Sequence, residues 1–112
     1  MKDSTAEIPY GTLDLLVLQT LSVMGPMHGF GIARRIEQIS NNLLQLNQGS
    51  IYPALLRLRQ QGWIHASWGK SDNNRRARFY SITPAGRRKL ESEVEAFERM
   101  TALVNRFLEV ES

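Results

Sequence analysis

A polar helix start followed by a basic, turn-rich segment constrains the fold of this chain more than any other feature. Residues 47–53 place amide and hydroxyl side chains at the beginning of an amphipathic stretch. Two aromatic-rich, partly alternating stretches follow at 63–68 and 76–82, and they flank a segment at 69–76 that is rich in Gly, Asn, Lys and Arg. Stretches of this kind on either side of such a turn predict a β-hairpin with a basic tip.

The first half of the chain predicts two helices and a short link. Apolar residues recur at helical spacing over about residues 12–24 and again over about 29–40, and Thr12 is suited to cap the first of these helices. A Gly-Pro pair ends the first helix, because proline cannot continue the hydrogen-bond ladder. Residues 43–46 are too few for a helix and indicate a small strand or an extended link.

Capping residues define two further helices. Asn47 is a suitable N-cap for a third helix that Gly62 ends, although Pro53 is tolerated most easily in a first turn and so also allows a start at Ser50. Thr83 is the expected N-cap of the last helix, whose first residue is a proline. The fold is therefore expected to be mainly α with a small β-hairpin, in the order of elements of a winged helix-turn-helix.

The last helix carries more apolar surface than a domain of this size can cover. Its apolar positions step by four and three residues in a heptad pattern, and a second apolar row lies alongside. A helix of ~25 residues is about 37 Å long and would overhang the body. We therefore expect dimerisation through this face, rather than coverage of the chain's own core alone, with these contact residues: Leu90, Val94, Phe97, Met100, Thr101, Leu103, Val104, Phe107 and Leu108.

These patterns divide the chain into three segments. We expect a flexible leader at residues 1–9, a winged helix-turn-helix DNA-binding domain at 10–83 and a C-terminal dimerisation helix at 84–112. The leader has no apolar run of the kind found in a signal peptide, and no aliphatic stretch approaches the ~20 residues needed to span a bilayer. The expected location is therefore the cytoplasm, with no membrane partner.

Positive charge is concentrated in the middle of the chain. Residues 33–89 hold eleven Lys or Arg against two acidic residues, whereas the segments before and after carry formal charges of −2 and −4. This asymmetry favours a polyanionic partner. The chain has no cysteine and only two histidines, with no metal-ligand spacing and no phosphate-binding glycine loop. We therefore expect no enzyme activity, no cofactor and no metal.

Two groups of residues are candidates for contact with duplex DNA. Amide and hydroxyl groups at the start of the third helix can reach base edges, and a basic hairpin tip, or wing, can neutralise phosphates. Either group alone is more typical of a solvated surface, and their joint occurrence in this order is what favours DNA. The third helix contributes Gln48, Gly49, Ser50, Tyr52 and Arg57; the wing and the start of the second helix contribute Lys70, Asn73, Asn74, Arg75, Arg76 and His28, which either caps that helix or touches a phosphate.

Specific motifs give the chain a resemblance to the PadR-like family of transcriptional regulators over about residues 10–90. The resemblance rests on segments 11–14, 27–32, 49–55, 62–64 and 78–86, of which Gly-Ser-Ile-Tyr-Pro-Ala-Leu is specific. Phe30 stands where the family usually has tyrosine. The resemblance implies a homodimeric winged-helix repressor that binds a pseudo-palindromic double-stranded DNA operator. It also implies release of the DNA by a small aromatic or hydrophobic effector.

A second class of function stays open at this point. The same fold could serve as a non-catalytic protein–protein interaction module whose wing and last helix bind protein, and salt-dependent retention on duplex DNA separates the two classes. The tryptophans and the histidine of the hairpin region have expected places in the fold. Trp63 is expected in the core, Trp68 lies at the base of the wing without a firm assignment, and His65 is expected on an exposed strand face.

Overall fold

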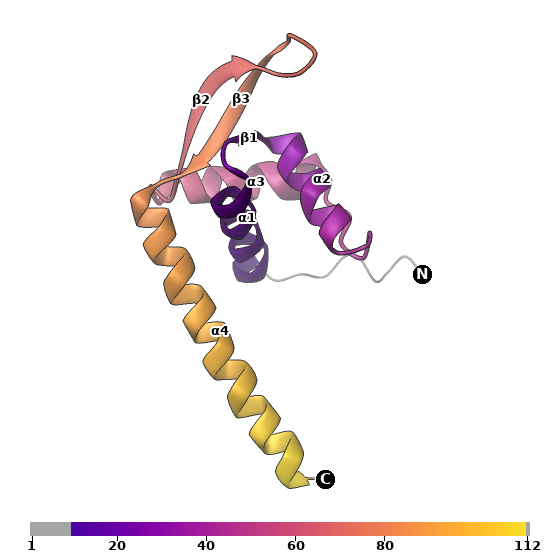
Figure 1. Cartoon of the computed structure of the whole chain (residues 1–112), viewed down its shortest axis with the longest axis vertical. Coiled ribbons are helices and arrows are strands. Elements are labelled where there is room, and N and C mark those ends of the chain that lie inside the picture. Colours follow the sequence, from indigo (N-terminus) through magenta and orange to yellow (C-terminus); the bar gives the residue numbers. More distant parts are fainter. Residues whose placement is uncertain (1–9, 112) are drawn as a thin grey trace.

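The computed structural model describes residues 10–111, so the expected leader at 1–9 lies outside the described residues. Within this range the order of elements is the one that the sequence predicts, apart from the place of the smallest strand (Figure 1). The elements are α1 (Tyr10–Met24), β1 (Met27–His28), α2 (Gly29–Ile39), α3 (Gln48–Gln60), β2 (Ile64–Lys70), β3 (Arg76–Ile82) and α4 (Pro84–Glu111).

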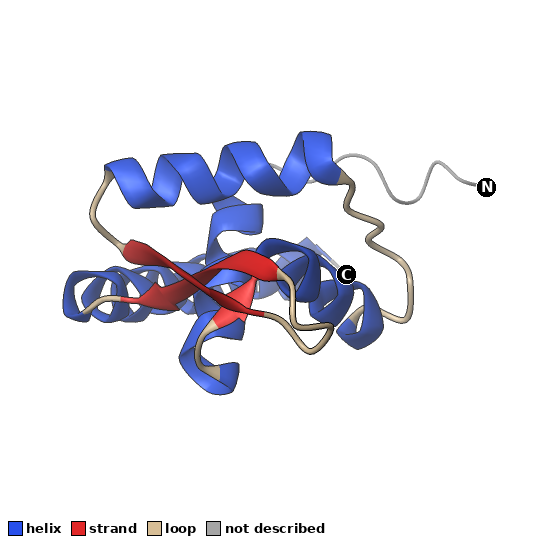
Figure 2. Ribbon diagram, turned by 90° about the horizontal axis from the view of Figure 1, so that it is seen from above, coloured by secondary structure: helices blue, strands red, loops and turns tan. Residues whose placement is uncertain are grey.

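Two elements project from a body made by the first three helices. The β2–β3 hairpin rises from one side of this body, and α4 starts at the base of the hairpin and extends the other way (Figure 1). Seen from above, the twisted hairpin lies in front of the helices (Figure 2). The molecule is therefore elongated, with principal extents of 57, 36 and 20 Å.

The expected capping residues set the bounds of α3. The Asn47 side-chain oxygen accepts a hydrogen bond from the Ser50 N–H at 3.1 Å, so the helix begins at Gln48. Pro53 therefore lies inside the helix, and the alternative start at Ser50 is wrong. Gly62 follows the helix with a φ of +79°, a conformation that residues with a Cβ rarely adopt.

One other expected bound is wrong, and one alternative that the sequence left open is decided. The helix α1 begins at Tyr10, two residues before the expected cap at Thr12, because the backbone is already helical there. Residues 43–46 form a bend and an extended link, as the second of the two alternatives had it, and the small strand is β1, which the sequence did not predict. Since β1 is held by antiparallel pairing with Phe79 and Tyr80 of β3, its position depends on a distant part of the chain that no local pattern reveals.

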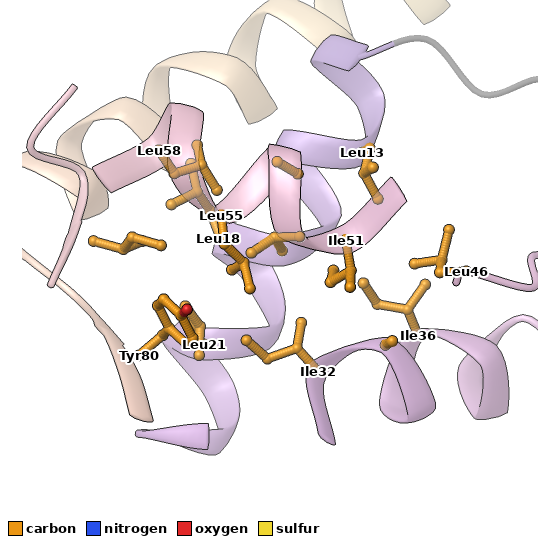
Figure 3. Packing of buried hydrophobic residues seen from close by; sticks show 14 of the residues in the cluster. Leu13, Leu18, Leu21, Ile32, Ile36, Leu46, Ile51, Leu55, Leu58 and Tyr80 are labelled. Carbon is orange, nitrogen blue, oxygen red and sulfur yellow. The ribbon is translucent and has the colours of Figure 1, made fainter. Parts of the chain in front are cut away.

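The core lies where the three N-terminal helices meet the base of the hairpin (Figure 3). Trp63, expected in the core, is instead half-buried at its edge, with the Lys89 ammonium 4.8 Å from the ring centroid. His65 is exposed, as expected. The most deeply buried side chains come from α1, α2 and α3, and they are Val17, Leu18, Leu21, Ile32, Ile51, Leu55 and Leu58.

The start of α4 is attached to the body, and the rest of the helix is not. The Thr83 hydroxyl caps the helix by accepting a hydrogen bond from the Gly86 N–H at 3.0 Å. Leu90 is buried and Val94 is half-buried against the core, although the sequence assigned both residues to the dimer contact. The exposed apolar surface of α4 therefore begins at Phe97, one or two turns later than expected.

Candidate nucleic-acid interface

An open groove of about 1080 Å³ lies between the hairpin and the beginnings of α2 and α3. Its lining brings together Phe30 and Arg34 from α2, Tyr52 from α3, and Trp68 and Arg78 from the hairpin. These residues are far apart in the sequence and meet only because the projecting hairpin lies next to the beginnings of α2 and α3. A concave surface of cationic and aromatic side chains suits a polyanion such as nucleic acid.

The start of α3 presents the side chains that the sequence singled out for base contact. Gln48, Gly49 and Tyr52 are exposed. Ser50 is half-buried, and its hydroxyl donates a hydrogen bond to the side-chain oxygen of the capping Asn47 at 3.4 Å. The Tyr52 ring lies against Gly29 of α2, where a Cβ would come within 2.7 Å of the ring. The glycine therefore lets α2 and α3 approach, and the contact fixes the tyrosine at the edge of the groove.

His28 is the N-cap of α2, one of the two roles that the sequence allowed. Its Nδ1 accepts a hydrogen bond from the Gly31 N–H at 3.0 Å, and its ring meets Phe79 edge to face with the centroids 5.8 Å apart. Because Nδ1 is the acceptor, the neutral ring carries its proton on Nε2. That Nε2–H is the group through which His28 could also donate to a phosphate in the groove.

Backbone hydrogen bonds hold the tip of the wing, which is the segment 71–75 between the two long strands. The Ser71 N–H donates to the Arg75 carbonyl at 2.8 Å, and the Asn74 N–H donates to the Ser71 carbonyl at 2.8 Å. Asn74 adopts a φ of +62°, which asparagine tolerates better than most residues. The tip thus presents the exposed side chains of Asn73, Asn74 and Arg75 from an ordered turn.

The last rung of the β2–β3 ladder joins two cations. Lys70 and Arg76 are direct cross-strand partners, and both are exposed. Like charges at opposite positions destabilise a strand pair, so this rung does not stabilise the hairpin by itself. A phosphate placed between the two side chains would reverse the sign of the interaction, which favours anion binding as the reason for their presence.

The structure places Arg57 apart from the other candidate residues. Its guanidinium forms an ion pair with Asp14 of α1, with 2.8 Å between nitrogen and oxygen, and both side chains are partly buried. Five residues separate Arg57 from Tyr52, which at 3.6 residues per turn puts it about 140° around the helix. Arg57 therefore joins α3 to α1 instead of lying on the exposed face where the sequence expected it.

Several residues that line the groove were missed as site residues, among them Phe30 and Arg34 of α2 and Trp68 and Arg78 of the hairpin. Phe30 and Arg34 lie one turn apart on α2, both line the groove, and the Arg34 guanidinium is 5.7 Å from the Phe30 ring centroid. Helical spacing places Arg34 on the polar side of α2, but only the tertiary arrangement shows that the hairpin faces this side.

Charge in the groove is mainly positive. Arg34, Arg75, Arg76 and Arg78 line it against a single carboxylate, that of Asp72. Within residues 10–111, no three His, Asp or Glu side chains converge as they would around a metal ion. None of the helices in this range is long and apolar enough to cross a membrane.

A helix beginning and a basic hairpin that border one groove on a three-helix body define the winged-helix class of DNA-binding proteins. The sequence matches the family model described as transcriptional regulator PadR-like over residues 17–92, a range that includes every element lining the groove. The chain belongs to the PadR-like family of transcriptional regulators. The resemblance stated from its motifs is thereby confirmed.

Similar proteins agree with this placement. The sequence is 38% identical over 90 residues to an uncharacterized 37.1 kDa protein in a transposon of Streptomyces fradiae; the match covers 80% of this chain but 24% of that protein. A transcriptional regulator from Clostridium thermocellum has a TM-score of 0.77 at 27% identity, covering 87% of this chain and 93% of its own. A PadR-like transcriptional regulator from Bacillus cereus has a TM-score of 0.75 at 24% identity, covering 88% and 92% of the two chains, which shows the same fold.

Proposed function

We propose that this PadR-like regulator is a sequence-specific repressor that binds a pseudo-palindromic operator as a homodimer in the cytoplasm. In this proposal the start of α3 enters the major groove and the wing lies along the neighbouring phosphates. The observation that carries the proposal is the groove, because it puts Tyr52 of α3 and the cations Arg75 and Arg76 of the wing on one concave surface.

The start of α3 and the wing are proposed to contribute differently to binding. Gln48 and Ser50, as short polar side chains at a helix start, are suited to base edges, and Gly49 lets the backbone approach the DNA. The wing residues Lys70 and Arg75 are suited to phosphates, which carry no sequence information directly. The remaining proposed phosphate contacts come from Asn73, Asn74, Arg76 and the Nε2–H of His28.

The proposed partner of the distal part of α4 is a second copy of this chain. Six apolar side chains between residues 97 and 108 are each 46–65% exposed, and they fall in the two heptad rows of the helix. At 28 residues α4 is about 42 Å long, while its contacts with the body's core, Leu90 and Val94, lie in its first half. A second α4 with the same pattern would cover both rows in a closed, two-fold contact.

Two-fold symmetry has a consequence for the DNA. A dimer of winged-helix domains presents two α3 helices, and each reads one half-site. The half-sites are therefore expected to be inverted copies separated by about one helical turn of 10 bp, or by a multiple of it. A repressor of this form acts where such a site overlaps a promoter.

Release by a small aromatic or hydrophobic effector is the last part of the proposal. A cavity of about 170 Å³ lies between α1 and α4, lined by Leu15, Leu18 and Trp63 among others. It is smaller than the ~300 Å³ of a usual ligand pocket, so the second copy would have to complete the site. An effector bound there releases DNA only if it prefers a geometry in which the two α3 helices no longer match the groove spacing.

Selection of binding sites from a random duplex library tests the proposal directly. We expect enrichment of an inverted repeat, and an affinity that falls steeply with salt as counterions are released. Titration of phenolic acids and cationic dyes against the selected operator, followed by tryptophan fluorescence and DNA affinity together, tests the effector. Retention of the chain by a protein partner, with no affinity for any duplex, would instead favour the interaction module.

A further inference from the structure

Trp68 is an aromatic side chain in an unusual place. It lies on β2 just before the basic tip of the hairpin, is 58% exposed and lines the groove instead of joining the core. Tryptophan is highly buried on average, so one that is mostly exposed on a projecting hairpin invites a local explanation. Its neighbours across the strands supply that reason.

Strand register places Trp68, Arg76 and Arg78 on one face of the wing, which Lys70 shares as the cross-strand partner of Arg76. Trp68 and Arg78 are direct cross-strand partners, and Arg76 is two residues from Arg78 on β3, so all three point the same way. Ile64 and Tyr80 share this face and are buried in the core at the base of the hairpin. The inward face of the wing therefore changes from core residues to tryptophan and arginine where it passes beyond the body and borders the groove.

The indole of Trp68 holds two guanidinium groups. The Cζ atoms of Arg76 and Arg78 lie 4.4 and 5.4 Å from its ring centroid, within the ~6 Å range of a cation–π contact. The Nε of Arg78 is buried and has no hydrogen-bond partner among the described residues, so the ring contact rather than a hydrogen bond at this atom orients its guanidinium. Both groups line the groove.

We propose that Trp68 is a positioning residue that holds Arg76 and Arg78 ready for backbone phosphates in the groove. The inference rests on the proposed DNA-binding function. A guanidinium that stacks through its flat face keeps its N–H edges available for phosphate oxygens. Two flexible side chains that are already ordered lose less conformational freedom on binding, and two cations held beside one ring also repel each other until an anion arrives.

The proposal separates Trp68 from two other roles. If Trp68 only supported the fold of the wing, its replacement would lower thermal stability together with DNA affinity. If the ring itself touched DNA, its contribution would persist when both arginines are removed. A positioning residue instead acts through Arg76 and Arg78, so its effect disappears in their absence, as a double-mutant cycle can measure.

The experiment measures affinity for the selected operator and for random duplex across a salt series. Trp68→Leu is expected to weaken binding to both duplexes roughly fivefold to tenfold, with the salt slope kept because the arginines still meet phosphates. Trp68→Phe should restore most of the affinity. In an Arg76→Gln/Arg78→Gln background, Trp68→Leu should cause no further loss. His65→Leu, a change at an exposed position of the same strand, is the matched control and should leave affinity unchanged.

Several results would overturn the proposal. They are an equal loss for Trp68→Leu with and without the arginines, unchanged affinity for Trp68→Leu, or a loss explained by a lower unfolding midpoint. Ring-current shifts of the arginine δ protons in the free protein test the stacking without DNA, and their absence in the wild type would also overturn it. A wild type that shows these shifts but binds no duplex would refute the proposed function and, with it, the phosphate as the ligand; normal wild-type binding beside an unaffected Trp68→Leu would refute this inference alone.

Discussion

The wing and the distal part of α4, residues 97–108, both project from the body, and they expose opposite kinds of chemistry. The wing carries cations and amides on an ordered turn, with like charges facing each other across its last rung. The distal part of α4 carries six large apolar side chains that are about half exposed. The like charges of the wing repel each other until an anion binds between them. The apolar side chains of α4 stay in unfavourable contact with water until a partner covers them.

This difference shows how an exposed region can indicate its partner. A cationic rung suits phosphates and depends strongly on salt, because its contribution is electrostatic. An apolar helix face suits a matching apolar face and depends little on salt. We therefore expect a substitution in the wing to leave dimerisation largely intact, and a substitution in the distal part of α4 to leave the salt dependence of DNA binding largely intact.

The largest effect is expected at Phe97. Phe97→Glu places an unpaired charge in the proposed seam between two α4 helices, at an expected loss of several kcal/mol in association. Sedimentation equilibrium at micromolar concentration should then give 12.8 kDa, instead of twice that mass for the wild type. Ala102→Glu adds the same charge outside both apolar rows and should leave the dimer intact. A wild type that sediments as a monomer would contradict dimerisation through the distal part of α4.

A smaller effect separates the attached and the free parts of α4. Leu90→Ala removes a buried side chain and should lower the free energy of unfolding by about 2–3 kcal/mol, while the Kd of the folded dimer stays unchanged. Leu108→Ala should do the reverse and raise the dimer Kd. Urea unfolding combined with sedimentation measures both quantities. If Leu90→Ala weakened association as strongly as Leu108→Ala, the division of the helix would be wrong.

Base and phosphate contacts should separate within the DNA surface. Gln48→Ala should reduce the preference for operator over random duplex by about 1–2 kcal/mol, since it removes a side chain suited to base edges. Arg75→Ala should weaken both duplexes alike and reduce the salt slope by about one unit. If Arg75→Ala changed sequence preference and kept the salt slope, the roles of α3 and the wing would be reversed.

The smallest effect is expected at the ion pair between α1 and α3. Asp14→Asn weakens the contact of Arg57 with α1 and should lower the free energy of unfolding by about 1 kcal/mol or less. The salt slope of DNA binding should not change, because this pair lies away from the groove. If Arg57→Gln reduced the salt slope of DNA binding and Asp14→Asn did not, Arg57 would have to contact a DNA phosphate.

Much of the fold could be predicted from sequence because its signals are local. Asn47 and Thr83 occupy caps whose geometry depends on neighbouring residues, and Gly62 marks a turn of positive φ. Aromatic-rich, partly alternating stretches on both sides of a Gly- and Asn-containing turn are enough to define the hairpin. These features depend on a few consecutive residues, so they survive without knowledge of the tertiary structure.

The parts that could not be predicted depend on distant contacts. The two residues of β1 become a strand only because β3 lies beside them, and Arg57 is drawn to a carboxylate on α1. Helical periodicity places Leu90 and Phe97 in one heptad row. Leu90 is buried and Phe97 is exposed because the helical body reaches only the first of them. Arg34 also lines the groove only because of the tertiary structure, since the projecting hairpin lies next to the beginning of α2.

In the proposed complex, two copies joined through α4 present two α3 helices and two wings to one duplex. The most direct test is native mass spectrometry of the complex with the selected operator, combined with hydroxyl-radical footprinting. We expect two chains per duplex and two protected half-sites related by inversion, about one helical turn or a multiple of it apart. One chain bound per operator, or protection without a repeated half-site, would contradict this arrangement.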